Sequence, residues 1–255
     1  MIKRKKKKIA FIYEGAKTEK ELFQNLTQIF FSEKADVSII SFPAEGNIYM
    51  LWTRLKKDRF ETGVIEVIKE MSFEARQILS DNTEDDFSEI YMFFDYDGHN
   101  NNIPKEYTGK DILCEMLETF NNETEYGKLY ISYPMIESLK EISVNSKTYK
   151  NFYMPLYDIR NYKEISGGKT DFKNFNNITR DMWYIACNAS RKRASLIVLY
   201  RENCTYKEFL EKLEQYNIYM EQKEKFIKMN YMIAILNSVP LFLIEYYGEN
   251  LWNII

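Results

Sequence analysis

The sequence predicts an α/β fold in which helices flank a parallel sheet, followed by a helical C-terminal extension. Two short, continuously apolar segments, 9–13 and 90–94, are typical of strands buried on both faces of such a sheet. Segments with the apolar spacing of helices alternate with the strand-like segments, which favours right-handed parallel crossovers. This alternation stops after about residue 143. We therefore expect an α/β core over residues 8–142 and a mainly helical extension over residues 143–255.

The first expected elements are a strand, a tight turn and a helix. Residues 9–13 (IAFIY) end abruptly at Glu14-Gly15. From Thr18, which we expect to be the N-cap, apolar side chains recur at the i, i+3 and i+4 positions of a helix. The elements expected next are a strand at 37–42, a helix at 47–58 and continued helical spacing over 62–79.

The second apolar strand, 90–94 (IYMFF), also ends in acidic residues, at Asp95-Tyr96-Asp97. Further along, Pro134 favours the start of a helix. No strand is predicted between residues 145 and 194, a region rich in Tyr, Asn, Lys and Phe. The remaining expected elements are helices at 108–121, 206–216 and 218–236, a strand at 128–132 and a last apolar segment at 239–247.

Composition excludes several kinds of chemistry. The 255 residues contain one histidine, His99, which rules out metal sites and mechanisms that need two imidazoles. The three cysteines are widely spaced and form no CxxC pair, so neither a disulfide framework nor a structural zinc is indicated. The most apolar stretch, 232–244, is too short for a bilayer, and the N-terminal residues do not resemble a signal peptide. We expect a cytoplasmic protein whose chemistry depends on carboxylates.

Positive charge is concentrated in two places of an otherwise acidic chain. Residues 3–8 carry six positive charges, so the net charge of −3 leaves −9 for the rest. The lysine run at 5–8 either contacts a nucleic-acid backbone or is a solvated arm that shields an edge strand. The second patch is open between nucleic-acid binding and a charged helix end; it comprises Lys169, Lys173, Arg191, Lys192 and Arg193.

Carboxylates follow both apolar strands at the point where each strand ends. Glu14 comes directly after 9–13, and Asp95 and Asp97 come directly after 90–94. Because ligands gather at the carboxyl ends of parallel strands, we expect the three carboxylates to converge. A cation would neutralise such a cluster, and ligation by oxygen alone favours Mg²⁺ or Mn²⁺. The alternative is that these acids cap helices or face solvent.

These acids belong to two motifs that stand in a fixed order. An EGxxTE motif (14–19) follows the first strand, and a DxD motif (95–97) follows another strand about 80 residues later. The pattern resembles the Toprim domain, which topoisomerases, bacterial primases, OLD nucleases and small RNA-processing nucleases share. Together with the segment YPMIESL (133–139), it is most similar to stand-alone defence proteins, namely the RloB-like group and the Toprim effectors of PARIS anti-phage systems.

The resemblance implies roles for individual residues. Glu14 would act as a general acid or base or bind a metal ion, and Asp95 and Asp97 would bind the metal ion. Glu19 would be an additional acid of the site, and Glu137 would bind a second ion. Two ions that share a phosphodiester stabilise both the attacking and the leaving oxygen. The expected cofactor is therefore Mg²⁺ or Mn²⁺.

Structural interpretations stay open for several of these residues. Glu19 and Glu137 are also typical of the first turn of a helix, where acids are common. His99 lies just beyond the acidic turn and either moves a proton, contacts a phosphate or is an ordinary loop residue. Lys17 is either a phosphate contact or a solvated side chain.

The resemblance implies a Mg²⁺-dependent endonuclease, an effector of anti-phage defence that acts by abortive infection. Its substrate would be nucleic acid, with tRNA favoured and DNA still open, and an ABC-type ATPase partner would restrain it until it is triggered. Because the sequence has no Walker A motif, the ATPase would be another chain. A homodimer is also open. The alternatives are a housekeeping RNA-processing Toprim nuclease and a non-catalytic Toprim regulatory or binding protein.

Overall fold

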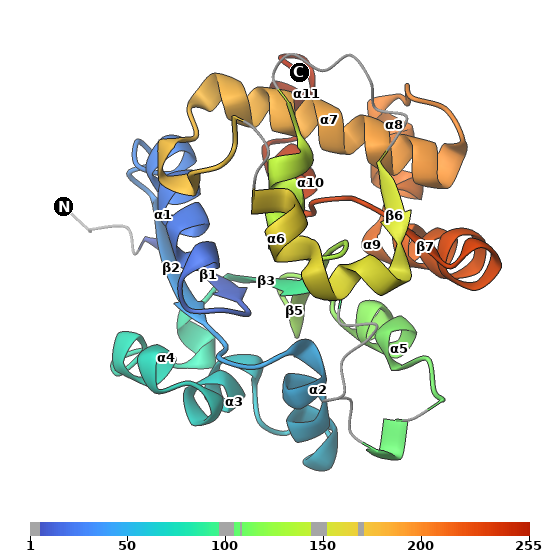
Figure 1. The fold of residues 1–255 in the computed structure, drawn as a ribbon. Coiled ribbons are helices and arrows are strands. Elements are labelled where there is room, and N and C mark those ends of the chain that lie inside the picture. Colours follow the sequence, from blue (N-terminus) through green and yellow to red (C-terminus); the bar gives the residue numbers. More distant parts are fainter. Residues whose placement is uncertain (1–5, 97–104, 108, 144–151, 168–170) are drawn as a thin grey trace. The chain divides into compact units, whose positions relative to one another are not determined.

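The protein was analysed as a computed structural model, which is drawn in Figure 1. The chain forms two compact units, Met1–Leu129 and Tyr130–Ile255, which are described separately. The core predicted over residues 8–142 stays a prediction. The residues that the structure describes are 6–96, 105–107, 109–143, 152–167 and 171–255.

A five-stranded sheet, in the order β2-β1-β3-β5-β4, carries the α/β part of the fold. β1 (Lys7–Tyr13) is parallel both to β2 (Val37–Pro43) and to β3 (Glu89–Asp95). β4 (Asn121–Asn122) pairs antiparallel with β5 (Gly127–Ser132). The α/β class and the mostly parallel sheet are therefore confirmed.

Strand β1 is covered on both faces, which explains its continuous apolar sequence. Its residues from Ile9 to Ile12 are completely buried. On one face, Tyr13 stacks on Phe23 of α1 (Thr18–Phe30), with ring centroids 5.2 Å apart. Figure 1 shows α1 on one side of β1 and β2, and α2 (Ile48–Lys57) and α3 (Val64–Met71) on the other side. This is the arrangement that right-handed crossovers in opposite directions require.

Two helix boundaries in the first unit differ from the prediction. The N-cap of α1 is Lys17, and Thr18 is the first helical residue. The helical spacing over 62–79 forms two helices because Ser72 is extended (φ −113°, ψ 124°). Its Oγ accepts the N–H of Ala75 at 3.0 Å and so caps the second helix. The other helical elements here are α4 (Phe73–Ile78), η1 (Glu84–Asp86), η2 (Lys105–Tyr107) and α5 (Ile112–Thr119).

The second unit is mainly helical. Its longest helix, α7 (Arg180–Leu199), packs against the apolar helix α10 (Val239–Tyr247), and the Cys187 thiol donates to the carbonyl oxygen of Pro240. Among the described residues, no helix combines the length and the apolar composition that a membrane crossing needs. The other helical elements are η3 (Ile136–Glu141), η4 (Leu156–Asn161), α6 (Tyr162–Gly167), η5 (Phe175–Asn177), α8 (Tyr206–Lys212), α9 (Gln215–Glu221), the π-helical η6 (Gln222–Lys228) and α11 (Glu249–Trp252). The segment after Pro134, expected to be an α-helix, is the 3₁₀-helix η3.

Two short strands in the second unit correct the sequence prediction. β6 (Tyr153–Pro155) lies where no strand was expected, and β7 (Met232–Ala234) lies where a helix was expected. They pair antiparallel. The side chain of Gln222 bonds both backbone groups of Ala234, accepting from its N–H at 3.0 Å and donating to its carbonyl oxygen at 2.6 Å. Gln222 thus replaces a neighbouring strand along β7, which is why this segment is extended rather than helical.

Candidate active site

The carboxylate of Glu14 lies at the end of the neighbouring strand. Glu14 is the residue after β1, and its Oε2 accepts the backbone N–H of Asp95, the last residue of β3, at 3.3 Å. The two strands are parallel, with Tyr13 opposite Phe93, so their carboxyl ends lie side by side. Both acids are half-buried. The structure therefore brings Glu14 and Asp95 together at this edge of the sheet.

The rest of the predicted acidic turn lies outside the described residues. This applies to Asp97 and His99. Within the described part of the chain, no group of three or more Asp, Glu, His or Cys side chains could hold a metal ion. Glu14 and Asp95 supply two carboxylates without a thiol or imidazole, which is the donor chemistry that Mg²⁺ and Mn²⁺ prefer. The residues that are described fit the expected ion by donor type, and their catalytic role stays a prediction.

Glu19 is hydrogen-bonded to the loop that follows β1 and contains Glu14. Its Oε1 accepts the backbone N–H of Gly15 at 3.1 Å, and the residue is only 9% exposed. Burial, followed by the charge of Glu74, raises the pKa of Tyr13, and the charge of Glu19 raises it further. The carboxylate of Glu19 therefore binds the backbone of the loop and also contributes to the raised pKa of Tyr13.

Glu137 belongs to the second unit, where it is almost completely buried. Its Oε1 lies 3.6 Å from Nζ of Lys163, and its Oε2 has no hydrogen-bond partner among the described residues. The nearby Tyr162 hydroxyl has a raised pKa, first because of burial and then because of Glu141, whereas Arg193 lowers it and Glu137 raises it. Glu137 is thus a buried carboxylate that forms an ion pair with the exposed Lys163, and its role as a metal ligand stays a prediction.

The predicted basic residues fall into different environments. Lys17 is exposed at the N-cap of α1, in the loop that follows Glu14. Arg193 is only 7% exposed and donates to the carbonyl oxygens of Ile235 and Glu141, so its charge serves the interior of the second unit rather than a binding surface. Lys169 lies outside the described residues.

Of the three other members of the basic patch, Lys173 is exposed outside the helices, whereas Arg191 and Lys192 lie on α7 and are half-buried. Arg191 places its guanidinium 4.5 Å from the centroid of the Trp252 ring and donates to Asn188. Lys192 follows it on the same helix. Because Arg191 is held by an aromatic ring and an amide of its own unit, the patch offers less free charge than its sequence indicated.

One acid near the site was missed by sequence reasoning. Asp111 caps α5, where its carboxylate accepts the N–H of Cys114 at 3.4 Å. Burial raises the pKa of Tyr96, the middle residue of the DxD motif, and the charges of Tyr49 and Asp111 raise it further. Asp111 therefore lies close enough to Tyr96 to contribute to the raised pKa of its hydroxyl. The sequence signal was an acid just before an apolar helical pattern, which is also the ordinary signature of an N-cap.

Comparisons with protein-family models, with curated proteins and with solved structures find no match to this chain.

Proposed function

We propose that the protein is a Toprim-type phosphodiesterase that cleaves nucleic acid with Mg²⁺ or Mn²⁺. The observation that carries the proposal is the bond from the Asp95 N–H to the Glu14 carboxylate, at the shared end of two parallel strands. The same two residues begin the EGxxTE and DxD motifs. Geometry and motif therefore indicate the same edge of the sheet, which is where ligands bind in open parallel sheets.

In this proposal each residue has a role that follows from its position. Asp95, with Asp97 as the resemblance implies, holds the ion through carboxylate oxygens. A bound Mg²⁺ would supply Lewis-acid stabilisation of the charge that develops on the phosphodiester. Glu14, whose Oε2 is oriented by the Asp95 amide, takes a proton from the attacking water or returns one to the leaving oxygen.

The proposed biological setting is anti-phage defence, with tRNA as the favoured substrate and DNA as the other. It rests on the resemblance to the stand-alone defence proteins. Two features of the sequence are compatible with an effector that a partner ATPase holds until release: the chain has no Walker A motif, and its body is acidic outside residues 3–8.

The test is cleavage by the isolated, full-length chain. Wild type, Glu14→Gln and Glu21→Gln are incubated with tRNA, ribosomal RNA, single-stranded DNA and duplex DNA, with Mg²⁺ or with chelator. Glutamine at 14 keeps an oxygen that can accept the Asp95 N–H but cannot transfer a proton. Glu21, an acid in the first turn of α1, serves as the control. Cleavage that needs Mg²⁺ and Glu14 but not Glu21 supports the proposal, and the substrate that is cut names the class. Metal binding without cleavage of any substrate would favour the non-catalytic alternative.

A further inference from the structure

We propose that Glu19 is a positioning residue, which fixes the loop after β1 and thereby aims the Glu14 carboxylate at the end of β3. This inference rests on the proposed function. It differs from the role of additional acid that the resemblance implies for Glu19. We call the contact between Glu19 and the Gly15 amide the Gly15–Glu19 clamp.

The clamp joins a rigid helix to the loop. Glu19 lies in the first turn of α1, which is anchored to the core by Leu22, Phe23 and Leu26, all completely buried. From this helix the carboxylate reaches back to the Gly15 N–H at 3.1 Å. A hydrogen bond from a backbone N–H to a carboxylate is stronger than one between neutral groups. The loop is therefore held by an element that packing has already placed.

The clamp explains why residue 15 is a glycine. A Cβ on Gly15 would lie 2.9 Å from both carboxylate oxygens of Glu19, closer than real Cβ contacts. The φ angle of Gly15 is not in the left-handed region, so the backbone conformation itself does not call for glycine. With a Cβ at residue 15, the Glu19 carboxylate would have to move away from its present position, at which it accepts the Gly15 N–H.

The clamp acts on Glu14 through a single peptide plane. The N–H that Glu19 binds belongs to the peptide bond between Glu14 and Gly15. Because that bond is planar, fixing its N–H also fixes the carbonyl carbon of Glu14. The residue before Glu14, Tyr13, is held in β1, so the chain is fixed on both sides of the Glu14 Cα and the direction of its side chain is restricted. Displacing a reacting group by about 1 Å costs about 100-fold in rate.

Glu14 and Glu19 make different contacts. Glu14 bonds to the end of β3. Glu19 lies near the Tyr13 hydroxyl, whose pKa is raised chiefly by burial and by Glu74, raised less by Glu19, and lowered by a hydrogen bond with Ser41 of β2. Glu14 therefore reaches the neighbouring strand, whereas Glu19 binds the backbone of the loop that carries Glu14, and this difference favours a supporting role for Glu19.

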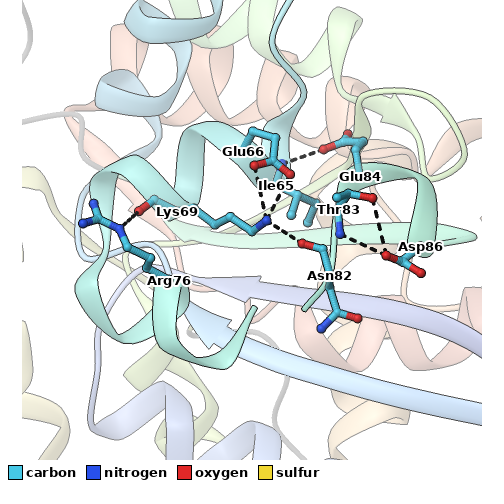
Figure 2. Close-up of polar contacts among 8 residues, drawn as sticks. All are labelled: Ile65, Glu66, Lys69, Arg76, Asn82, Thr83, Glu84 and Asp86. Atoms are coloured by element: carbon cyan, nitrogen blue, oxygen red, sulfur yellow. Dashed lines mark hydrogen bonds and ion pairs between the residues drawn. The ribbon is translucent and has the colours of Figure 1, made fainter. Parts of the chain in front are cut away.

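The first unit also provides a matched control. Glu84 makes the same kind of contact with the start of a helix: its Oε2 accepts the N–H of Ile65, in the first turn of α3, at 2.7 Å, and a Cβ on Gly63, the N-cap, would lie 2.5 Å from that oxygen. Figure 2 shows this contact within its polar network. We call it the Gly63–Glu84 clamp. It holds the start of α3 and has no connection to Glu14 through a shared peptide.

The experiment compares five variants of the full chain: Glu19→Gln, Glu19→Ala, Gly15→Ala, the double variant Glu19→Ala/Gly15→Ala, and Glu84→Ala. Glutamine keeps a carbonyl oxygen for the Gly15 N–H, so we expect its kcat to stay within about 3-fold of wild type. Alanine at 19 should lower kcat about 10- to 100-fold, with the Mg²⁺ dissociation constant changed less than 3-fold. The double variant should be no worse than Glu19→Ala, because the Cβ clash disappears with the carboxylate. Glu84→Ala should lower the melting temperature and leave kcat unchanged.

Each contrary result has a defined meaning. A Glu19→Gln variant as inactive as Glu19→Ala, with weaker Mg²⁺ binding, would show that Glu19 is a metal ligand and overturn the proposal. Unchanged kcat in Glu19→Ala would overturn it too. If the wild type cleaves nothing, the proposed function fails, and the clamp is judged by hydrogen exchange at the Gly15 amide: exchange must rise in Glu19→Ala and not in Glu19→Gln, and equal exchange in all three proteins overturns the inference.

Discussion

Two backbone segments of the first unit are each held by a carboxylate, but they position different parts of the protein: the loop after β1 and the start of α3. In the Gly15–Glu19 clamp and in the Gly63–Glu84 clamp, a carboxylate binds a backbone N–H and fills the space that a Cβ would need. The first loop carries Glu14, which reaches the end of β3. The second segment begins α3. A hydrogen bond between a carboxylate and a backbone N–H therefore does not by itself indicate a function. The function depends on which side chain the held backbone segment positions.

The Gly63–Glu84 clamp is embedded in other polar contacts (Figure 2). Lys69 contacts Glu66 and the carbonyl oxygen of Asn82, and Asp86 accepts the N–H of Thr83 at 3.0 Å. The contact between Lys69 and Asn82 and the bond between Ile65 and Glu84 connect α3 to η1 and to the residues just before it. Because they satisfy backbone groups of a helix start and a loop, we interpret this network as a contribution to stability.

Among the substitutions that distinguish the two clamps, we expect the largest change in cleavage rate from the substitution of Glu14, which the first clamp positions. Glu14→Gln should lower the cleavage rate by about 10²- to 10⁴-fold, the usual contribution of a general acid or base, with the melting temperature little changed. Glu84→Gln should leave the rate unchanged. The measurement is the cleavage rate under saturating Mg²⁺. An active Glu14→Gln variant would contradict a proton-transfer role for Glu14.

The next effect concerns Gly63. Alanine there forces a Cβ against Glu84, at 2.5 Å from Oε2 and 2.6 Å from Cδ. We expect the free energy of unfolding to fall by about 1 to 3 kcal/mol, as for other overpacked sites. Denaturant unfolding measures this change. Cleavage by the folded variant should match the wild type, and a slower rate at a temperature where the variant is fully folded would show that the two clamps are not separate in function.

Removing the carboxylate of Glu84 should have a smaller effect than forcing a clash. Glu84→Ala leaves the N–H of Ile65, in the first turn of α3, without this acceptor. The expected loss is about 1 kcal/mol of the free energy of unfolding, as for other lost helix caps. Thermal unfolding followed by circular dichroism tests it. A variant as stable as the wild type would mean that water replaces the carboxylate at no cost.

The pH dependence of this clamp has a defined sign. Burial raises the pKa of Glu84 above its ordinary value of 4.5, although the N–H groups of Ile65 and Val64 oppose the shift. The folded protein therefore binds this proton more tightly than the unfolded chain. The stability that protonation contributes is fully present below about pH 4.5 and is lost as the pH rises through the raised pKa.

Glu84→Gln removes this titration and keeps an acceptor oxygen. Relative to the wild type, the variant should gain stability as the pH rises above about 4.5, with a constant difference above the raised pKa. Denaturant unfolding at several pH values measures the difference. A difference that is independent of pH, or one that falls with rising pH, would contradict the cause assigned to the shift.

The smallest effect is expected at Asp86, at the edge of the same network. Asp86→Ala removes the acceptor for the Thr83 N–H, which is exposed. The free energy of unfolding should fall by about 0.5 kcal/mol, at the low end for lost caps. If the free energy of unfolding fell as much as it does for Gly63→Ala, the stability that this network contributes would depend on η1 rather than on the contact at Gly63.

Sequence patterns predicted the parts of the fold that depend on burial. The apolar runs at 9–13 and 90–94 are strands because both faces of the sheet are covered there. The patterns failed where one distant side chain decides the conformation. Gln222 bonds Ala234 and turns an expected helix into β7, and the extended conformation of Ser72 divides an expected helical stretch.

Only part of the candidate site could be predicted from the sequence. The ends of the two apolar strands pointed to Glu14 and Asp95, and the structure joins these residues. The sequence did not predict the hydrogen bond between the Gly15 N–H and Glu19. An acid in the first turn of a helix has the same sequence pattern whether it binds backbone, a metal ion or water. Glu137 lies beside Lys163, a pairing that helical spacing does not reveal.

The measurement that tests the central claim most directly is a Mg²⁺ titration of nucleic-acid cleavage by wild type, Asp95→Asn and Glu84→Gln. Asp95 is placed at the end of β3 beside Glu14, whereas Glu84 serves α3. We expect Mg²⁺-dependent cleavage in the wild type and in Glu84→Gln, and loss of cleavage in Asp95→Asn that a higher Mg²⁺ concentration restores only in part. Cleavage that persists in the Asp95→Asn variant, and in the wild type after divalent ions are chelated, would contradict the account.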